Sequence, residues 1–285
     1  MKDIQRILVP IDFSLTAEKA FRFAVTIAKE QNARIILMHI YTPVEDVQVG
    51  TKDDRKKYKT QTEAILLKKL ERLRKKVTLN TPQVSVTLFV NKIPVIKNIL
   101  EFSERNKIDL IIMGTQGAAG LKKTIIGSIS SKIVEKTNIS VLLIPEKFEL
   151  KQIKHIVFAS NYQSSDKKAL SLLMTFAKPF NSKITMLHLI SAYSIVSDKE
   201  KEKNLFDTYA YSLQRRFSDH KLKFQLKETD SVTGTLENLD KEIPYDMVAM
   251  VRRKKSFYEK FFLGSFTKNM AYITRKPLLV VPEDD

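Results

Sequence analysis

The chain has 285 residues, 43% hydrophobic and 28% charged, as expected of a soluble globular protein long enough for two domains. It contains no cysteine, which excludes disulfides, thiol catalysis and cysteine-ligated zinc. The N-terminal segment lacks the layout of a signal peptide, and no apolar run approaches the roughly 20 residues of a membrane span. We therefore expect a cytoplasmic protein without a membrane partner, although its net charge of +17 suits anionic partners.

Apolar runs of strand length alternate with runs of helical periodicity through the first half of the chain. Strands are predicted at 4–10, 33–40, 84–90, 109–113 and 140–144. Helices are predicted at 14–30, 52–76, 95–106 and 127–138. Ser14 and Thr16 are the N-cap candidates of the first helix. Alternation of this kind indicates a parallel, doubly wound α/β sheet.

The helix predicted at 52–76 carries the densest basic region of the chain. Apolar residues recur along it at helical spacing, namely Ile65, Leu66, Leu70, Leu73 and Val77. We interpret it as an amphipathic helix with a solvated basic face. It shows no interleaved aromatic residues and no known DNA- or RNA-binding signature, so nucleic acid is not the expected partner.

Four of the seven glycines fall between residues 111 and 131, namely Gly114, Gly117, Gly120 and Gly127. An apolar strand leads into the first of them, and a predicted helix follows the last. Glycine lets the main chain approach an anion or adopt positive φ, and a helix N-terminus attracts negative charge. The stretch therefore predicts a phosphate-binding loop. Its glycine spacing is neither that of a Walker P-loop nor that of a dinucleotide site.

The second half of the chain repeats the first. Segments starting at Ile7 and Ile36 return 149 residues later, whereas those starting at Gly127 and Val141 return after 137 residues. The shorter offset predicts that the second copy has lost residues in the loop and helix after its second strand. We predict two tandem doubly wound domains, 1–147 and 151–285, each with a five-stranded parallel sheet in the order 3-2-1-4-5 flanked by helices.

Taken together, these segments resemble the universal stress protein family over nearly the whole chain, as a tandem pair. The family's nucleotide signature, Gly-x2-Gly-x9-Gly-Ser/Thr, is matched by Gly114, Gly117 and Gly127-Ser128. The resemblance implies ATP, or another adenine nucleotide, bound with Mg²⁺ at the C-terminal ends of the first and fourth strands. This is also where an open α/β sheet reverses strand order and leaves a crevice.

The resemblance also implies a set of binding residues. Pro10, Asp12 and Ile40 would surround the adenine and ribose, and Gly114 and Gly117 would approach the ribose and phosphates. The phosphates would meet N–H groups and hydroxyls of Gly127, Ser128, Ile129 and Ser130. Read from the residues alone, Asp12 follows a strand and could accept hydrogen bonds or help hold Mg²⁺. The alternative is that it only caps the helix that begins near Ser14.

The second copy departs from this pattern. Asn161 replaces Asp12, Val251 replaces Gly114 and Lys254 replaces Gly117, while Gly264-Ser265 persists. A β-branched valine tolerates positive φ poorly, and bulk at both glycine positions would crowd a nucleotide. We expect that this site has lost ATP, which leaves one nucleotide per chain. The alternative is that it binds another small anion or an acidic partner surface.

Three functions stay open. The favoured one is an ATP-binding stress-response sensor or regulator with an unidentified protein partner. A slow ATPase or autophosphorylating enzyme would need a dedicated general base beyond Asp12, so no catalytic residue is assigned. The third candidate, a basic scaffold for an anionic partner, rests on the net charge.

The domains are expected to form an intramolecular pseudo-dimer through their last strands, 141–144 and 278–281, and a homodimer stays open. His39 and His188, which recur at matching strand ends, are expected to be structural.

Overall fold

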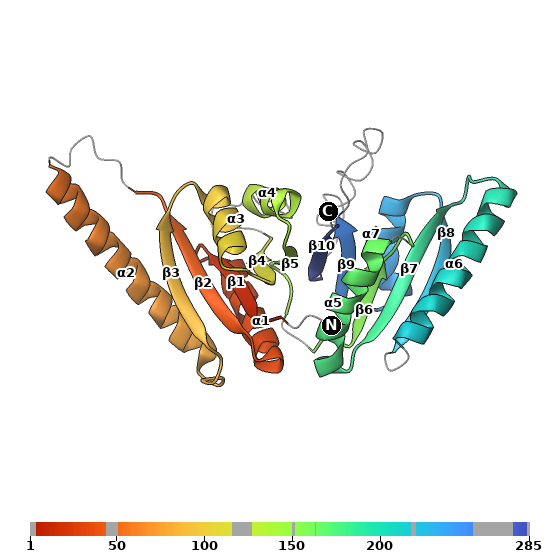
Figure 1. Ribbon diagram of the computed structural model, residues 1–285, viewed down its shortest axis with the longest axis horizontal. Coiled ribbons are helices and arrows are strands. Elements are labelled where there is room, and N and C mark those ends of the chain that lie inside the picture. The colour runs from red at the N-terminus through yellow and green to blue at the C-terminus, as the bar shows by residue number, and fades with distance from the viewer. Residues whose placement is uncertain are drawn as a thin grey trace. The chain divides into compact units, whose positions relative to one another are not determined.

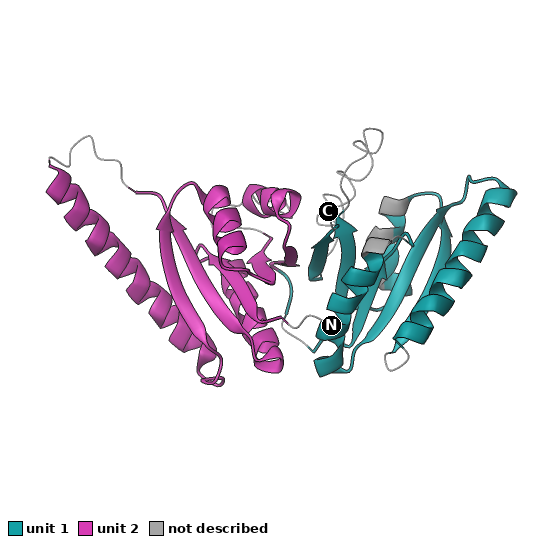
Figure 2. Ribbon diagram, viewed as in Figure 1, with its two compact units in different colours: residues 1–3, 123–126, 147–285 teal, residues 4–122, 127–146 magenta. Residues whose placement is uncertain are grey.

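The computed structural model describes residues 4–43, 51–115, 127–149, 152–162, 164–217, 221–252 and 276–283. They belong to two compact units, an N-terminal unit up to Glu146 and a C-terminal unit from Lys147 onward (Figure 2). Both units have an α/β fold with a parallel sheet, as predicted.

In the N-terminal unit, strands alternate with helices along the chain (Figure 1). The strands are β1 (Arg6–Ile11), β2 (Arg34–Tyr41), β3 (Val86–Lys92), β4 (Leu110–Gly114) and β5 (Ser140–Ile144). The helices are α1 (Leu15–Gln31), α2 (Lys52–Thr78), α3 (Val95–Arg105) and α4 (Ser128–Lys136). All paired strands are parallel, in the predicted order β3-β2-β1-β4-β5. Helix α1 packs beside α2, and α3 beside α4.

The C-terminal unit repeats this order as β8-β7-β6-β9-β10. Its strands are β6 (His155–Ala159), β7 (Lys183–Ser191), β8 (Leu222–Thr229), β9 (Met247–Arg252) and β10 (Leu278–Pro282), and its described helices are α5 (Ser164–Phe180), α6 (Val196–Arg216) and α7 (Val232–Glu242). Helix α2 has 27 residues and its counterpart α6 has 21. The second copy is therefore shorter after its second strand, as the changing offset predicts.

The central strands are buried on both sides, which explains their continuous apolar runs. Ile7, Leu8 and Val9 of β1 are fully buried. Helix α1 begins at the predicted place, because the Ser14 hydroxyl accepts a hydrogen bond from the Ala17 N–H at 3.1 Å. The other cap candidate, Thr16, was the wrong choice, since it lies inside the helix and is buried.

Helix α2 packs on β3 and β2 through a narrower face than predicted. Leu70 is fully buried, whereas Ile65 is 65% exposed. Five residues turn an α-helix by about 140° beyond one full turn, so these two side chains cannot share a face. The placement of Ile65 on the buried face was therefore wrong.

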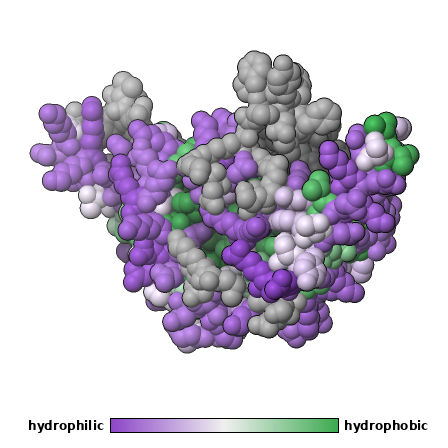
Figure 3. Space-filling model, turned by 45° about the vertical axis from the view of Figure 1, so that its right-hand side comes forward, coloured by the Kyte–Doolittle hydropathy of each residue, from purple (hydrophilic) through white to green (hydrophobic). Residues whose placement is uncertain are grey.

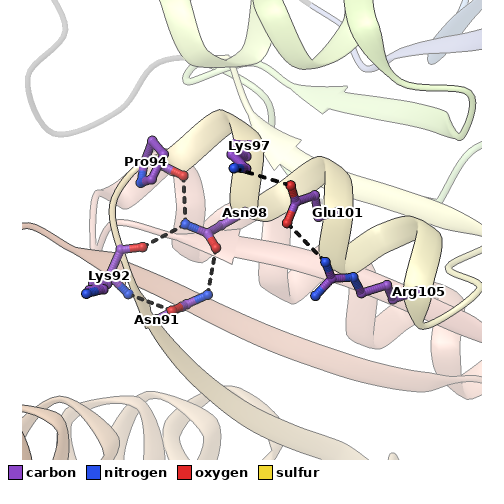
Figure 4. A network of polar contacts seen from close by, with 7 residues as sticks. All are labelled: Asn91, Lys92, Pro94, Lys97, Asn98, Glu101 and Arg105. Atoms are coloured by element: carbon purple, nitrogen blue, oxygen red, sulfur yellow. Dashed lines mark hydrogen bonds and ion pairs between the residues drawn. The ribbon is translucent and has the colours of Figure 1, made fainter.

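A polar network closes the corner between β3 and α3 (Figure 4). The Asn98 amide donates to the carbonyls of Lys92 at 2.7 Å and Pro94 at 2.8 Å, and it accepts from the Asn91 side chain at 2.8 Å. Because Pro94, at the N-cap position, makes no side-chain cap, Asn98 supplies the tie between strand and helix. The ladder of exposed charges beside it, Lys97–Glu101–Arg105, contributes little to stability by comparison.

Candidate functional site

The candidate site lies at the C-terminal ends of β1 and β4. The two strands pair at Ile7–Leu110 and Leu8–Ile111, and both continue beyond this pairing. From these ends, the chain moves toward β2 on one side and toward β5 on the other. Open α/β sheets have their ligand crevice at such a switch point. Of the predicted residues, Pro10 and Ile40 are half-buried at this edge of the sheet.

At the end of β1, a tight turn presents the Asp12 carboxylate. Asp12 is exposed, and its Oδ1 accepts a hydrogen bond from the Ser14 N–H at 3.0 Å. This is an Asx-type turn just before the helix, while Ser14 itself is the N-cap. The alternative role of Asp12 as the cap of α1 is therefore wrong.

Two aromatic rings, those of Phe13 and His39, pack together at this turn. Phe13 has a φ of 64°, and its ring centroid lies 4.6 Å from that of His39. The Nδ1–H of His39 donates to the Ile11 carbonyl at 2.6 Å, which holds the end of β1. In the C-terminal unit, His188 donates in the same way to the Ser160 carbonyl at 2.7 Å. No pattern in the sequence indicates the role of Phe13, whereas the repeated histidine was a usable signal.

The burial of His39 makes stability depend on pH. Burial, followed by the nearby charge of Lys69, holds the pKa of His39 below its ordinary value. The unfolded chain, with an ordinary histidine pKa of about 6.5, then binds more protons on acidification. His39 thus contributes stability above that pH, which is lost as the pH falls through its folded pKa. We expect wild type to lose more unfolding free energy than His39→Asn between about pH 7.5 and pH 5.

Urea unfolding at the two pH values measures this difference. The asparagine can still donate to Ile11 but cannot titrate, so it is the matched variant. Because burial also lowers the pKa of His155, some pH dependence should persist in His39→Asn. Equal losses in both proteins would show that His39 does not contribute.

At the end of β4, main-chain and hydroxyl bonds fix the start of α4. Ser130 is buried, and its hydroxyl donates to the Gly114 carbonyl at 2.8 Å. The Thr115 carbonyl accepts from the Gly127 N–H, and the Thr115 N–H donates to Ile144 at 3.0 Å. The two ends of segment 116–126 are thus joined. That segment, which includes Gly117 of the predicted site, lies outside the described residues.

The N-terminus of α4 is open to an anion. Its N-cap is Gly127, which provides no side-chain cap, and its first turn contains no acidic residue. The first intrahelical bond runs from the Ser131 N–H to the Gly127 carbonyl at 3.1 Å, so the N–H groups of 128–130 precede it. Ser128 and Ile129 are exposed. Main-chain N–H groups and the positive end of the helix dipole therefore favour negative charge here.

Gly114 is required for the packing of α1, whereas its predicted approach to the ribose and phosphates stays a prediction. None of the described glycines has positive φ. Instead, a Cβ on Gly114 would lie 2.7 Å from the Thr16 Cγ2 and 3.1 Å from the Thr16 carbonyl carbon. The glycine thus permits the start of α1 to pack on the end of β4. In the second copy Val251 stands at this position, and the sequence has serine at position 165 in place of Thr16.

The matching strand end of the C-terminal unit is built differently. Asp166 of α5 is fully buried and accepts from the Ser160 hydroxyl at 2.6 Å and from the Asn161 N–H at 3.1 Å. A buried carboxylate thus holds this end of β6, where the N-terminal unit exposes Asp12. Lys254, Gly264 and Ser265 lie outside the described residues. The loss of ATP from this unit stays a prediction.

The described residues contain neither a candidate metal cluster nor a candidate membrane span. In that part of the chain, no group of three or more His, Cys, Asp or Glu side chains could hold a metal ion. Nor does it contain a helix of the length and hydrophobicity needed to cross a membrane.

Comparison with known proteins places these features in context. The sequence model of the Universal stress protein family matches residues 3–145 and again 152–282. Universal stress protein MJ0531 of Methanocaldococcus jannaschii is 26% identical over 142 residues, which are 49% of this chain and 81% of the relative. Universal stress protein YxiE of Bacillus subtilis is 28% identical over 154 residues, 49% of this chain and 97% of the relative. Each of these relatives therefore matches about half of the chain.

Among solved structures, a universal stress protein from Archaeoglobus fulgidus shares the fold along the whole chain. It has a TM-score of 0.70 at 14% sequence identity and covers 99% of this chain and 98% of its own. At this identity, the likeness concerns the fold alone.

Proposed function

The chain belongs to the universal stress protein family, and we propose that its N-terminal unit binds an adenine nucleotide, ATP foremost, as a regulator in the stress response. The observation that carries the proposal is the uncapped start of α4, which is fixed to the end of β4 at the switch point of the sheet. One universal stress protein has been solved in complex with cAMP. The proposal for this chain rests on its own residues.

The described residues offer a contact to each of three parts of a nucleotide, namely its phosphates, its ribose and its adenine. The N–H groups at the start of α4, from Ser128 and Ile129, would receive the phosphates, with Gly127 leaving the approach unobstructed. Asp12 would accept hydrogen bonds from the ribose hydroxyls. Pro10 and Ile40, half-buried at the sheet edge, would flank the adenine. Gly117, as in the family signature, would complete the set.

The Ser130 hydroxyl, which was expected to donate to a phosphate, is engaged elsewhere. Its hydroxyl proton is engaged by the Gly114 carbonyl, so a phosphate would meet the main chain of this residue and not its hydroxyl proton. Mg²⁺ would arrive with the triphosphate, and Asp12 is the carboxylate that would assist it.

The arrangement favours regulation over catalysis. Phosphoryl transfer depends on cations placed around the transferred group. Lys69 is a cation close to this turn, but its ammonium group lies over the Phe13 ring, 4.0 Å from the ring centre, and is therefore already engaged in a cation–π contact. A phosphate on the N–H groups of α4 would act directly on the joint between Thr115 and Gly127. Occupancy would thereby reach both ends of segment 116–126 and alter what the protein contacts.

Calorimetric titration of nucleotide-free, full-length protein with ATP and Mg²⁺ tests the proposal. We expect one site per chain, because Val251 and Lys254 stand at the two glycine positions of the signature in the C-terminal unit. Competition with ADP, AMP and cAMP then ranks the adenine nucleotides. No heat at millimolar ATP would overturn the nucleotide site, and two sites per chain would overturn the loss in the second copy.

A further inference from the structure

Helices α2 and α6 occupy the same place in the two units but differ in charge. Helix α2 contains eleven lysines and arginines against four acidic residues, whereas α6 contains five against four. Both helices follow the second strand of their unit and lead to its edge strand. Since α6 does this with nearly balanced charge, the fold does not require the basic surplus of α2.

Part of the surplus lies on the side of α2 that faces away from the sheet. At about 100° per residue, the positions roughly opposite the buried Leu70 are Asp54, Lys57, Gln61, Ile65, Lys68, Arg72 and Lys75. Lys75 pairs with Glu71 at 3.7 Å. We call Lys57, Gln61, Ile65, Lys68 and Arg72 the outer face of α2, and all five are exposed. In Figure 1 the helix diverges from β3 toward its N-terminal end, and residues 51–61 are all exposed. The surface over α2 in Figure 3 is mostly hydrophilic.

The acidic residues of the helix do not pair with the three cations of this face. Glu71 pairs with Arg74 at 2.6 Å, and Glu63 lies 3.9 Å from Lys59. Asp54 is engaged by Thr51 in the capping box. Within the described part of the chain, no ion pair is formed by the three cations of the outer face.

Ile65 decides which class of partner fits. It is 65% exposed in the middle of the basic row. An apolar centre surrounded by charge is the anatomy of a protein interface. A phosphate backbone would leave this side chain without an apolar partner. A membrane surface requires a broad apolar face, but the apolar face of α2 packs on the sheet. A second copy of this chain, with a net charge of +17, would be repelled.

We propose that the outer face of α2 docks an acidic amphipathic helix of a partner protein, with Ile65 inserted among apolar side chains and the three cations opposite carboxylates. This surface goes beyond the nucleotide site and does not depend on it. It gives a regulator of this kind a defined place to contact its target.

The experiment uses full-length protein and a fluorescein-labelled synthetic peptide that carries glutamates around one leucine on one helical face. Fluorescence anisotropy measures its affinity for wild type, for K57Q/K68Q/R72Q and for the matched α6 variant K201Q/K203Q/R215Q. Both triple variants remove three positive charges from exposed helix positions. We expect the α2 variant to bind about tenfold or more weakly and the α6 variant within about twofold of wild type. Ile65→Ala should weaken binding about threefold.

Three results would overturn the proposal. The peptide fails to bind, the α6 variant weakens binding as much as the α2 variant, or a DNA duplex or phosphatidylglycerol vesicles bind more tightly than the peptide through the same α2 cations. Circular dichroism melts confirm that the variants are folded. ATP calorimetry on the α2 variant should match wild type, so a failure of the nucleotide site and a failure of the docking surface give different results.

Discussion

Gly114→Ala is expected to lower the free energy of unfolding of the N-terminal unit by about 1–3 kcal/mol, the usual cost of overpacking a filled site. The added methyl would lie 2.7 Å from the Thr16 Cγ2, closer than real contacts allow, and 3.1 Å from a main-chain atom of the same residue. Thr16 is itself buried at the start of α1. The helix would therefore have to shift, and the main-chain contact cannot be relieved by a rotamer change. Urea unfolding followed by circular dichroism measures the loss.

The chain offers two matched variants for this test. Thr16→Ser removes the methyl group that the new Cβ meets first, so Gly114→Ala/Thr16→Ser should recover part of the loss. This pair imitates the second copy, where the sequence has Val251 together with serine at position 165. Gly234→Ala in α7 makes the same chemical change where the nearest atom would be 3.4 Å away. Alanine should leave stability unchanged there or raise it by about 0.5–1 kcal/mol.

If Gly114→Ala is as stable as wild type, helix α1 does not pack on the end of β4 in this way. If the double variant is no better than the single one, the Thr16 methyl is not the obstacle. In either case, the close contact would no longer explain why glycine occupies this position of the signature.

The positions of the strands could be read from the sequence because their cause is local. A parallel strand covered on both faces is apolar at consecutive positions, as Ile7, Leu8 and Val9 are, and the repeat gives each strand a second independent reading. The candidates for the N-cap of α1 could be narrowed to two hydroxyl-bearing residues for the same reason. The strand and helix ends differ by one or two residues, because fraying ends carry little pattern.

Other features depend on contacts that form only in the folded chain. The Ser130 hydroxyl was expected at a phosphate, but the Gly114 carbonyl takes its proton. Periodicity placed Ile65 with Leu70, although the sheet covers only a narrow strip of α2. Asp166 stands where the first copy has alanine, and nothing in the motif announced a buried carboxylate there. Each case requires knowing which groups surround the side chain in the folded protein.

Ser128→Glu is expected to weaken ATP binding about tenfold or more while leaving the protein equally stable or slightly more so. Ser128 is the first residue of α4 and is exposed, and the first turn contains no acidic residue. A carboxylate at this position interacts favourably with the helix dipole, by about 0.3–1 kcal/mol. The same charge would occupy the region where the nucleotide phosphates are proposed to lie, and it would repel them. Calorimetry and urea unfolding on the same variant measure the two effects.

The opposite directions of these effects make the test specific. A variant that simply damages the fold would lose both stability and affinity, whereas Ser128→Glu should lose affinity alone. Ser128→Gln has nearly the same shape without the charge, so its affinity should stay within about threefold of wild type. Should Ser128→Glu bind ATP as tightly as Ser128→Gln, the phosphates do not lie at the start of α4. The nucleotide would then have to be held by the β1 end of the crevice alone, where Asp12 presents a negative charge that suits ribose hydroxyls and opposes a phosphate.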